Sequence, residues 1–336
     1  SYIDNEGFSE TITTASKQIE WTRLIGTNNA EVGLALTSGS DNSIYVTGTT
    51  YGLNFNGVTG STFDGIPTSG LTDGFLLKFD TDGNKKWSKL SSTIGSDSGR
   101  DLSVGNDGSI YLAGSTSGDL DGQINNGETD GFITKFNPDG DRDWTKLIGT
   151  GDKENAEFIS IGIDGSIFVA GDNYESNPNY QRGSLNNDGT NSPLIYNAGY
   201  ISKYNSEGNL EWKILLGEEN SKVGGLVTSA DGSVYISGFT SEDLDGITNS
   251  GGDDIFLSKF SSNGIREWTK LYGSSTDDQA EGLAISADGS LFITGNTDGN
   301  LDGEINNGNK DVFITKFSSD GSRTWTRLLG STGDDE

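Results

Sequence analysis

The sequence predicts an all-β fold of repeated four-stranded antiparallel units, and two observations carry this prediction. A unit of ~57 residues recurs five times along the chain. Each copy holds four short runs rich in β-branched and aromatic residues, which in residues 281–330 read GLAIS, LFITG, DVFITKF and TWTRLLG. No segment shows the apolar stripe of a helix. Four antiparallel strands in a repeat of this length are the pattern of a β-propeller blade.

Three residue types fix the register of the repeat. A tryptophan opens the fourth strand, a glycine closes the second strand, and an aromatic residue occupies the third strand. The step from the third-strand aromatic to the next Trp is 12 residues in every copy, as from Phe132 to Trp144. In chain order the anchors are Trp21, Trp87, Trp144, Trp212, Trp268 and Trp325; Gly48, Gly114, Gly171, Gly238 and Gly295; Phe75, Phe132, Tyr200, Phe256 and Phe313. Because these slots are fixed, we expect the six Trp to pack between blades.

Almost all of the length variation lies in the connection between the second and third strands. Asp-Gly pairs such as Asp107-Gly108 and Asp139-Gly140 predict tight turns elsewhere. Insertions around 51–72 and 172–198 should therefore stand on one face, which also carries the linkers between blades. A rigid scaffold with one free loop per unit is typical of a binding face.

These boundaries predict a single β-propeller over residues 19–336. A polar segment or degenerate strand precedes it at 1–18, and one extra Trp strand lies at 19–26. Small residues in the runs Gly33–Thr37 and Gly282–Ser286 place the first strand of each blade innermost. The chain is either a five-bladed ring with an additional edge strand or a segment of a longer array. The predicted blades are 31–92, 99–149, 157–217, 223–273 and 280–330.

The repeat resembles the bacterial SBBP-type β-propeller repeat. The resemblance rests on an Asp-Gly-Ser-(Ile/Leu/Val)-(Tyr/Phe) turn and strand, then Asp-x-Phe-(Ile/Leu)-x-Lys-Phe, then Trp-(Thr/Ser)-Lys-Leu-x-Gly, and it covers about residues 20 to 330. It implies a propeller fold, found mostly in large secreted or surface proteins. The family name implies seven blades, whereas five are visible in this chain.

Composition excludes several classes of function. The net charge of −28 disfavours nucleic acid and anionic membranes as partners, because both are bound chiefly through Lys and Arg. The chain has no Cys and no His, so it cannot form a disulfide, a thiolate or imidazole metal site, or a Ser-His-Asp or Cys-His catalytic centre. It has no apolar run long enough to span a membrane.

Three loops carry oxygen side chains at spacings that suit a hard cation, and Ca²⁺ is the cofactor that they suggest. The alternative is that these Asx residues cap turns through hydrogen bonds to the backbone. The candidate ligands are Asp119, Asp121, Asn125 and Asp130; Asp243, Asp245, Asn249 and Asp254; Asn300, Asp302, Asn306 and Asp311.

The predicted function is a non-enzymatic, secreted or cell-surface module with a structural or adhesive role. We expect it to belong to a larger multidomain chain, with a protein or glycan partner at the loop-bearing face. Tyr174, Tyr180 and Tyr196, in the long loop of the third blade, are candidate ligand contacts. The alternatives are a carbohydrate-binding, lectin-like propeller and a five-bladed glycoside-active enzyme; the abundance of acidic pairs makes the enzyme the weaker one.

Overall fold

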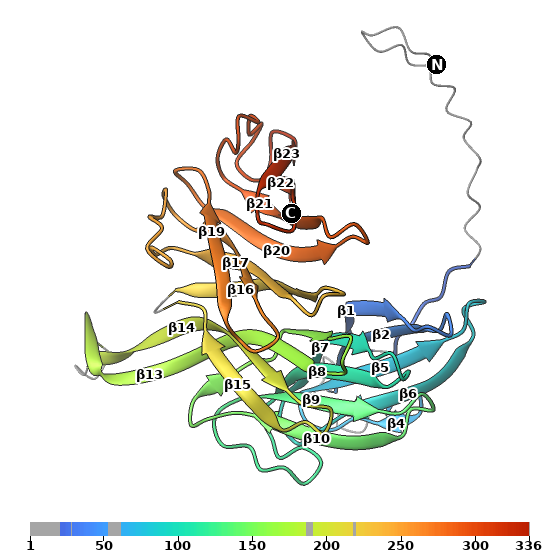
Figure 1. The fold of residues 1–336 in the computed structure, drawn as a ribbon. Coiled ribbons are helices and arrows are strands. Elements are labelled where there is room, and N and C mark those ends of the chain that lie inside the picture. Colours follow the sequence, from blue (N-terminus) through green and yellow to red (C-terminus); the bar gives the residue numbers. More distant parts are fainter. Residues whose placement is uncertain (1–20, 28, 53–61, 186–190, 218–219, 336) are drawn as a thin grey trace, which may run out of the picture.

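The computed structural model describes residues 21–27, 29–52, 62–185, 191–217 and 220–335, apart from the side chains of residues 175–185 and 191–197. Every regular element in this part of the chain is a β-strand, so all-β is confirmed (Figure 1). None of these residues belongs to a helix that could cross a membrane.

The strands form five successive antiparallel sheets in chain order, with a small hairpin beside the first. The first sheet holds β1 (Glu31–Ser38), β2 (Ile44–Tyr51), β5 (Thr72–Phe79) and β6 (Lys85–Ser91), and the hairpin is β3 (Thr62–Phe63) and β4 (Ile66–Pro67). The second holds β7 (Asp97–Val104), β8 (Ile110–Thr116), β9 (Asp130–Phe136) and β10 (Arg142–Ile148). The third holds β11 (Lys153–Glu154), β12 (Phe158–Ile161), β13 (Ile167–Leu185), β14 (Asn191–Tyr204) and β15 (Leu210–Leu215). The fourth holds β16 (Ser221–Thr228), β17 (Val234–Thr240), β18 (Asp254–Phe260) and β19 (Arg266–Tyr272). The fifth holds β20 (Asp278–Ile285), β21 (Leu291–Thr297), β22 (Asp311–Phe317) and β23 (Arg323–Leu329).

The first strands of consecutive sheets lie against one another, β1 on β7, β7 on β12, β12 on β16 and β16 on β20. This is the innermost position that their small residues predict. Apolar side chains of neighbouring sheets meet between them, as where Tyr235 and Leu257 of the fourth sheet pack with Ile293 and Phe313 of the fifth. The core is therefore divided into layers, one at each of the four junctions between sheets and one formed by the first sheet and its hairpin.

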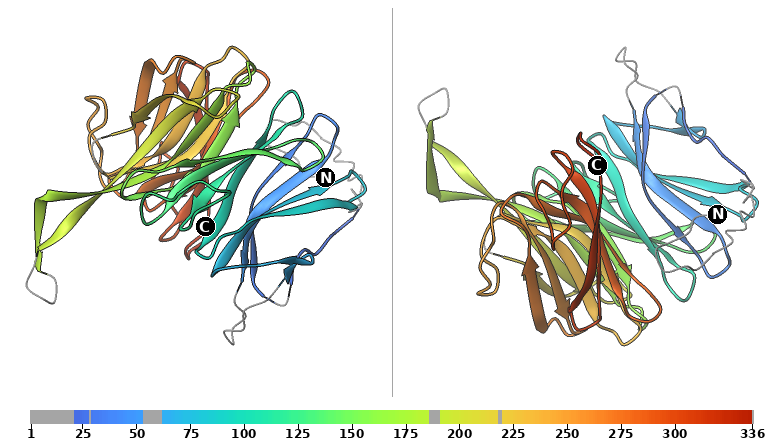
Figure 2. Two further views of the ribbon diagram at one scale, coloured as in Figure 1. Left: turned by 90° about the horizontal axis from the view of Figure 1, so that it is seen from below. Right: turned by 90° about the horizontal axis from the view of Figure 1, so that it is seen from above.

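Two expectations drawn from the sequence need correction. The predicted loop at 172–198 is mostly a continuation of β13 and β14, which remain paired as far as Leu185 and Asn191 and project from the molecule (Figure 2). The predicted extra strand at 19–26 is described from Trp21, and residues 21–27 form no ladder with any described strand. Neither outcome could be predicted from the residues of the segment itself, because the pairing of a strand depends on its partner strand.

A tryptophan of each of the first four sheets packs on a turn glycine of the next sheet. The ring of Trp87 lies 2.8 Å from the point where a Cβ would stand on Gly140, and Trp144 stands 2.9 Å from the same point on Gly208. Both glycines have positive φ, +83° and +76°. Glycine allows this turn and leaves space for the indole. The same contact joins Trp212 to Gly264 and Trp268 to Gly321. The tryptophans at this position of the first four sheets therefore lie at the junctions between sheets.

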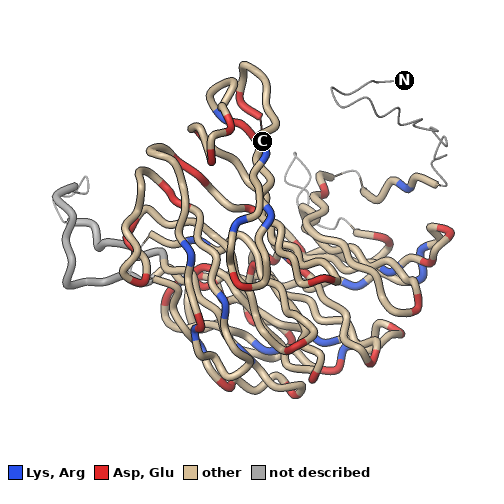
Figure 3. Tube along the Cα trace, turned by 45° about the horizontal axis from the view of Figure 1, so that its top comes forward, with Lys and Arg blue, Asp and Glu red and all other residues tan. Residues whose placement is uncertain are grey.

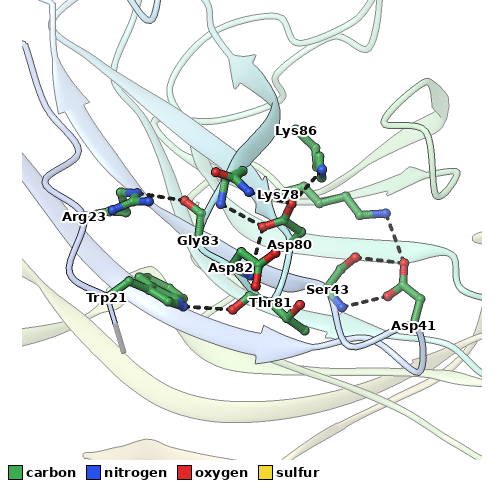
Figure 4. Close-up of polar contacts among 11 residues, drawn as sticks. Trp21, Arg23, Asp41, Ser43, Lys78, Asp80, Thr81, Asp82, Gly83 and Lys86 are labelled. Carbon is green, nitrogen blue, oxygen red and sulfur yellow. Dashed lines mark hydrogen bonds and ion pairs between the residues drawn. The ribbon is translucent and has the colours of Figure 1, made fainter. Parts of the chain in front are cut away.

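The segment 21–27 makes this contact with the first sheet even though it forms no ladder. The Trp21 ring lies 2.6 Å from the Cβ point of Gly83. Its Nε1 donates to Thr81 O at 2.8 Å, and Arg23 Nε donates to Gly83 O at 3.0 Å (Figure 4). Residues 21–27 therefore cover the first sheet as each Trp strand covers the sheet that follows it.

Candidate functional site

A cavity of about 400 Å³ opens where the first, second and third sheets meet at their inner strands. It is lined by the start of β1 and of β7, by the ends of β2 and β8, and by residues of the adjoining connections. These are the strand ends that carry the second-to-third connections and the inter-sheet linkers. The cavity thus lies on the loop-bearing face that the sequence predicts.

Hydroxyl groups dominate the lining of this cavity. The serine and threonine residues are Thr49, Thr72, Ser96, Ser98, Ser115, Ser117 and Thr129. Some of them also bond to one another: Thr49 Oγ1 and Ser98 Oγ are 2.6 Å apart across the junction between the first two sheets, and Ser96 N donates to Ser117 Oγ at 2.7 Å within the second unit. Val32 and Leu34 add partly exposed apolar surface. A lining of hydroxyl groups beside apolar side chains suits an uncharged ligand that has both polar and apolar surface.

Two cations reach this cavity, Arg100 on β7 and Lys153 on β11. Arg100 Nε lies 3.5 Å from Glu157 Oε2 and makes no hydrogen bond in the described structure. Lys153 Nζ stands 4.8 Å from the centre of the Tyr174 ring, its ladder neighbour on β13. Of the three candidate tyrosines, Tyr174 is therefore brought next to the cavity. The side chains of Tyr180 and Tyr196 lie outside the described residues.

Buried carboxyl groups surround these cations. Burial raises the pKa of Asp97, which lines the cavity, although the Thr116 and Thr93 hydroxyls and the Thr93 amide oppose the shift. Burial also raises the pKa of Asp172 to about 6, and the nearby Glu157 carboxyl adds to the effect. The pKa of the Tyr174 hydroxyl is raised by burial first and then by the charge of Asp172. In the wider molecule Asp and Glu concentrate at turns and loops, while many Lys and Arg lie along strands (Figure 3).

The candidate calcium ligands are brought close together loop by loop, and each already accepts a hydrogen bond, whereas Oδ1 of Asp130, Asp254 and Asp311 is buried without a hydrogen-bond partner among the described residues. In the second sheet, Asp119 Oδ1 accepts from Asn125 N at 2.9 Å, Asn125 Oδ1 from Gly127 N at 3.0 Å, and Asp130 Oδ2 from Asn126 N at 3.0 Å. The same three bonds recur at Asp243, Asn249 and Asp254 and at Asn300, Asn306 and Asp311.

The remaining candidate in each loop, Asp121, Asp245 or Asp302, is held by the fourth strand of its own sheet. Asp121 pairs with Arg142 and accepts from Thr145 Oγ1 at 2.6 Å. Arg266 and Thr269 hold Asp245 in this way, and Arg323 and Thr326 hold Asp302. All three aspartates have φ between +52° and +60°. Within the described residues, no group of three or more acidic side chains could hold a metal ion. These contacts favour turns capped by Asx residues, and calcium binding stays a prediction.

A fourth aspartate is held by a cation and a hydroxyl of the fourth strand in the same way, and the sequence analysis did not predict it. Asp64, in the β3–β4 hairpin, has φ +54° and is held by Lys85 and Ser88. Phe63 before it is buried and stacks on Phe75 with ring centroids 4.9 Å apart, in the place that Leu120 takes in the second sheet. The signal was in the sequence: Asp64 and Asp121 each precede their cation by 21 residues and their hydroxyl partner by 24.

A melting experiment distinguishes calcium binding from turns capped by Asx residues. Because each candidate ligand already accepts at least one hydrogen bond, we expect CaCl₂ and NaCl of matched ionic strength to raise the melting temperature equally, by screening the charge of −28. A larger rise in CaCl₂ would establish a site that binds only the folded chain. If that excess disappears in a chain carrying Asp119→Asn and Asp243→Asn, the site lies in these loops.

Comparison with known proteins supports the repeat. The family model described as SBBP, a β-propeller repeat, matches residues 267–302, which run from β19 through β21. The regulatory protein FlaEY of Caulobacter vibrioides is 25% identical over 93% of this chain and 35% of its own length. An uncharacterised WD repeat-containing protein, L264, of Acanthamoeba polyphaga mimivirus is 24% identical over 93% of the chain and 29% of its own length. The chain thus spans about a third of these relatives.

Among solved structures, a protein of unknown function from Bacteroides caccae is similar in fold. It superposes with a TM-score of 0.48 at 10% identity, covering 89% of this chain and 82% of its own.

Proposed function

Because this chain carries an SBBP-type β-propeller repeat, we propose that it is a non-enzymatic interaction module of a secreted or cell-surface protein, with a structural or adhesive role. The observation that supports this most is the contrast between the two ends of the sheets. One end is built from repeated tight turns with glycines of positive φ. The other carries the connections of variable length and the cavity at Arg100 and Lys153. A partner would bind at this second end.

A lectin-like function is the second candidate, and the hydroxyl-rich lining of the cavity favours it. Its Ser and Thr side chains can exchange hydrogen bonds with sugar hydroxyls, while Val32, Leu34 and Tyr51 offer apolar surface to a sugar ring. The glycoside-active enzyme has less support. One carboxylate, Asp97, lies among the described lining residues, whereas glycosidases generally use a pair.

A glycan array followed by calorimetry tests the lectin-like candidate. We expect Arg100→Ala to weaken the binding of any glycan hit by about tenfold or more, because a hydrogen bond to a charged group contributes roughly 1.5–3 kcal/mol. Lys86→Ala is the matched control, since Lys86 pairs with Asp80 on the outer part of the first sheet. Equal binding by wild type and Arg100→Ala would place the ligand elsewhere. An array without hits, together with a protein partner captured through the loop-bearing face, would leave the adhesive module as the function.

A further inference from the structure

Two acidic side chains lie next to each other at the junction between the first and second sheets. Asp73 belongs to β5, and Asp97 is the first residue of β7. The residues before them, Thr72 and Ser96, form a parallel β-bridge, which places the two aspartates side by side on strands about 4.8 Å apart. Both side chains are buried, at 0% and 1% exposure. Two carboxyl groups this close together and away from water cannot both be ionised without a large cost in free energy.

Hydrogen bonds position the two carboxyl groups but leave one oxygen without a donor. Both oxygens of Asp73 accept hydrogen bonds, one from a backbone amide and one from a serine hydroxyl. Asp97 Oδ2 accepts from Thr93 N at 2.6 Å, whereas Asp97 Oδ1 is buried without a hydrogen-bond partner among the described residues. The nearby Thr116 hydroxyl donates to Gly118 O instead. A proton held between the two carboxyl groups would give this oxygen a partner.

The same pairing of acids recurs along the repeat. Asp130 and Glu154 are the equivalent pair at the junction between the second and third sheets. At the junction between the fourth and fifth sheets, Asp254 Oδ1 and Asp278 Oδ2 lie 2.2 and 3.0 Å from the position that a Cβ of Gly273 would take. The two carboxyl groups therefore reach the same point there.

The junction between the third and fourth sheets has neither acid. Ala198 takes the place of Asp73, and Ser221 takes the place of Asp97. Both are buried, and Ser221 Oγ accepts from Gly199 N at 3.0 Å. At the four junctions the two positions are thus either both acidic or both uncharged. If each carboxylate only capped its own turn, the loss of one would not have to accompany the loss of the other. The pattern indicates a role that needs both carboxyl groups.

We propose that Asp73 and Asp97 share one proton in the folded chain, which makes the junction between the first two sheets a pH-dependent contact. When the pH rises, the proton leaves, and two adjacent negative charges remain. The electrostatics support this geometry. Burial raises the pKa of Asp73 to about 6, and the charge of Asp97 adds to the effect, although hydrogen bonds from Ser92 and Ser69 oppose it. Burial also raises the pKa of Asp97.

The charged groups around the pair do not replace the proton. The charge of Asp121 acts on Asp97 from the loop after β8, and Asp121 is itself paired with Arg142. Arg100 and Lys153 line the same cavity as Asp97. Within the described part of the chain, no Lys or Arg forms an ion pair with either carboxyl group of the pair.

The direction of the pH effect follows from the raised pKa of Asp73. The folded chain keeps this proton up to about pH 6, whereas an unfolded aspartate releases it near pH ~4. The stability that the proton contributes is therefore fully present below about pH 4 and is lost as the pH rises through about 6. Between pH ~5 and ~7.5, this shift lowers the ratio of folded to unfolded chain about tenfold.

Carboxyl ¹³C NMR of the wild-type chain, assigned through the backbone, tests the shared proton directly. We expect one carboxyl carbon of the pair Asp73 and Asp97 to titrate near pH ~6 and the other below pH ~4, because coupled groups lose their protons in two separate steps. Two midpoints below pH ~5 would overturn the proposal, since both groups would then be ionised at neutral pH.

A double substitution, Asp73→Ala with Asp97→Ser, copies the residues of the uncharged junction. Its ratio of folded to unfolded chain should fall about tenfold less than that of the wild type between pH ~5 and ~7.5, as measured by urea melts. Glu128→Ala with Glu242→Ser removes the same charge at exposed positions and should keep the wild-type pH dependence. Equal pH dependence in the wild type and the Asp73→Ala, Asp97→Ser chain would contradict the proposal. An excess stabilisation by CaCl₂ over matched NaCl at neutral pH, absent from that chain, would make a cation the shared group and also overturn it.

Discussion

Gly114→Ala should lower the free energy of unfolding by about 3 kcal/mol, at the upper end of what overpacking a closely packed site costs. A Cβ on Gly114 would stand 2.0 Å from the backbone carbonyl oxygen of Ser98 and 2.6 Å from the Phe132 ring. Neither neighbour can move away without a large cost in free energy, because the carbonyl belongs to the innermost strand β7 and the Phe132 ring is 0% exposed. Urea melts at equilibrium measure the effect.

Gly151→Ala is the matched control for this substitution. Gly151 lies in the following linker, and a Cβ there would meet no atom within 4 Å. Its substitution should change stability by no more than about 0.5 kcal/mol. If the two alanine variants melt alike, the second-strand glycine is not needed for close approach, and the explanation of this repeat anchor is wrong.

Trp144→Ala should cost roughly 2–4 kcal/mol, which is below the full range for a buried Trp because Trp144 is only half-buried. The substitution removes the contact with Gly208 in the next sheet and the pairing with Tyr111 in its own, where ring centroids are 6.3 Å apart. Trp325→Ala removes only the contacts within its own sheet, so about 1 kcal/mol is expected. Equal losses at the two positions would show that the junction contributes little to stability.

The fold was largely predictable because its strongest signals are local and repeated. The Trp, Gly and aromatic anchors each mark one strand, and the Asp-Gly turns need positive φ at glycines such as Gly108 and Gly140. The turns depend on neighbours within a few residues, and the anchors are visible from their spacing within each copy. Because the repeat occurs five times, the sequence shows each of these signals in five copies.

The misjudged features depend on partners that are far apart in the sequence. Residues 172–198 contain Pro and Asn and suggest a loop, yet β13 and β14 continue to pair there because each supplies the other's hydrogen-bond partners. The contacts of Asp121 and Asp245 could not be predicted from their loops, since the arginine that pairs with each lies 21 residues further along the chain. The cavity at Arg100 and Lys153 draws on three sheets, and spacing within one repeat could not reveal it.

Five of the six Trp, all but Trp325, lie on the turn glycine of the sheet that follows them, and one NMR spectrum tests this arrangement most directly. With ¹³C-labelled glycine in a deuterated chain with protonated Trp, a NOESY experiment reads the α-protons of Gly83, Gly140, Gly208, Gly264 and Gly321. All five stand close to an indole ring, at 2.6 to 2.9 Å from their Cβ points. We predict strongly upfield-shifted α-protons at these five glycines, with cross-peaks to Trp21, Trp87, Trp144, Trp212 and Trp268 in that order. Glycine signals at ordinary positions without indole cross-peaks would contradict the account.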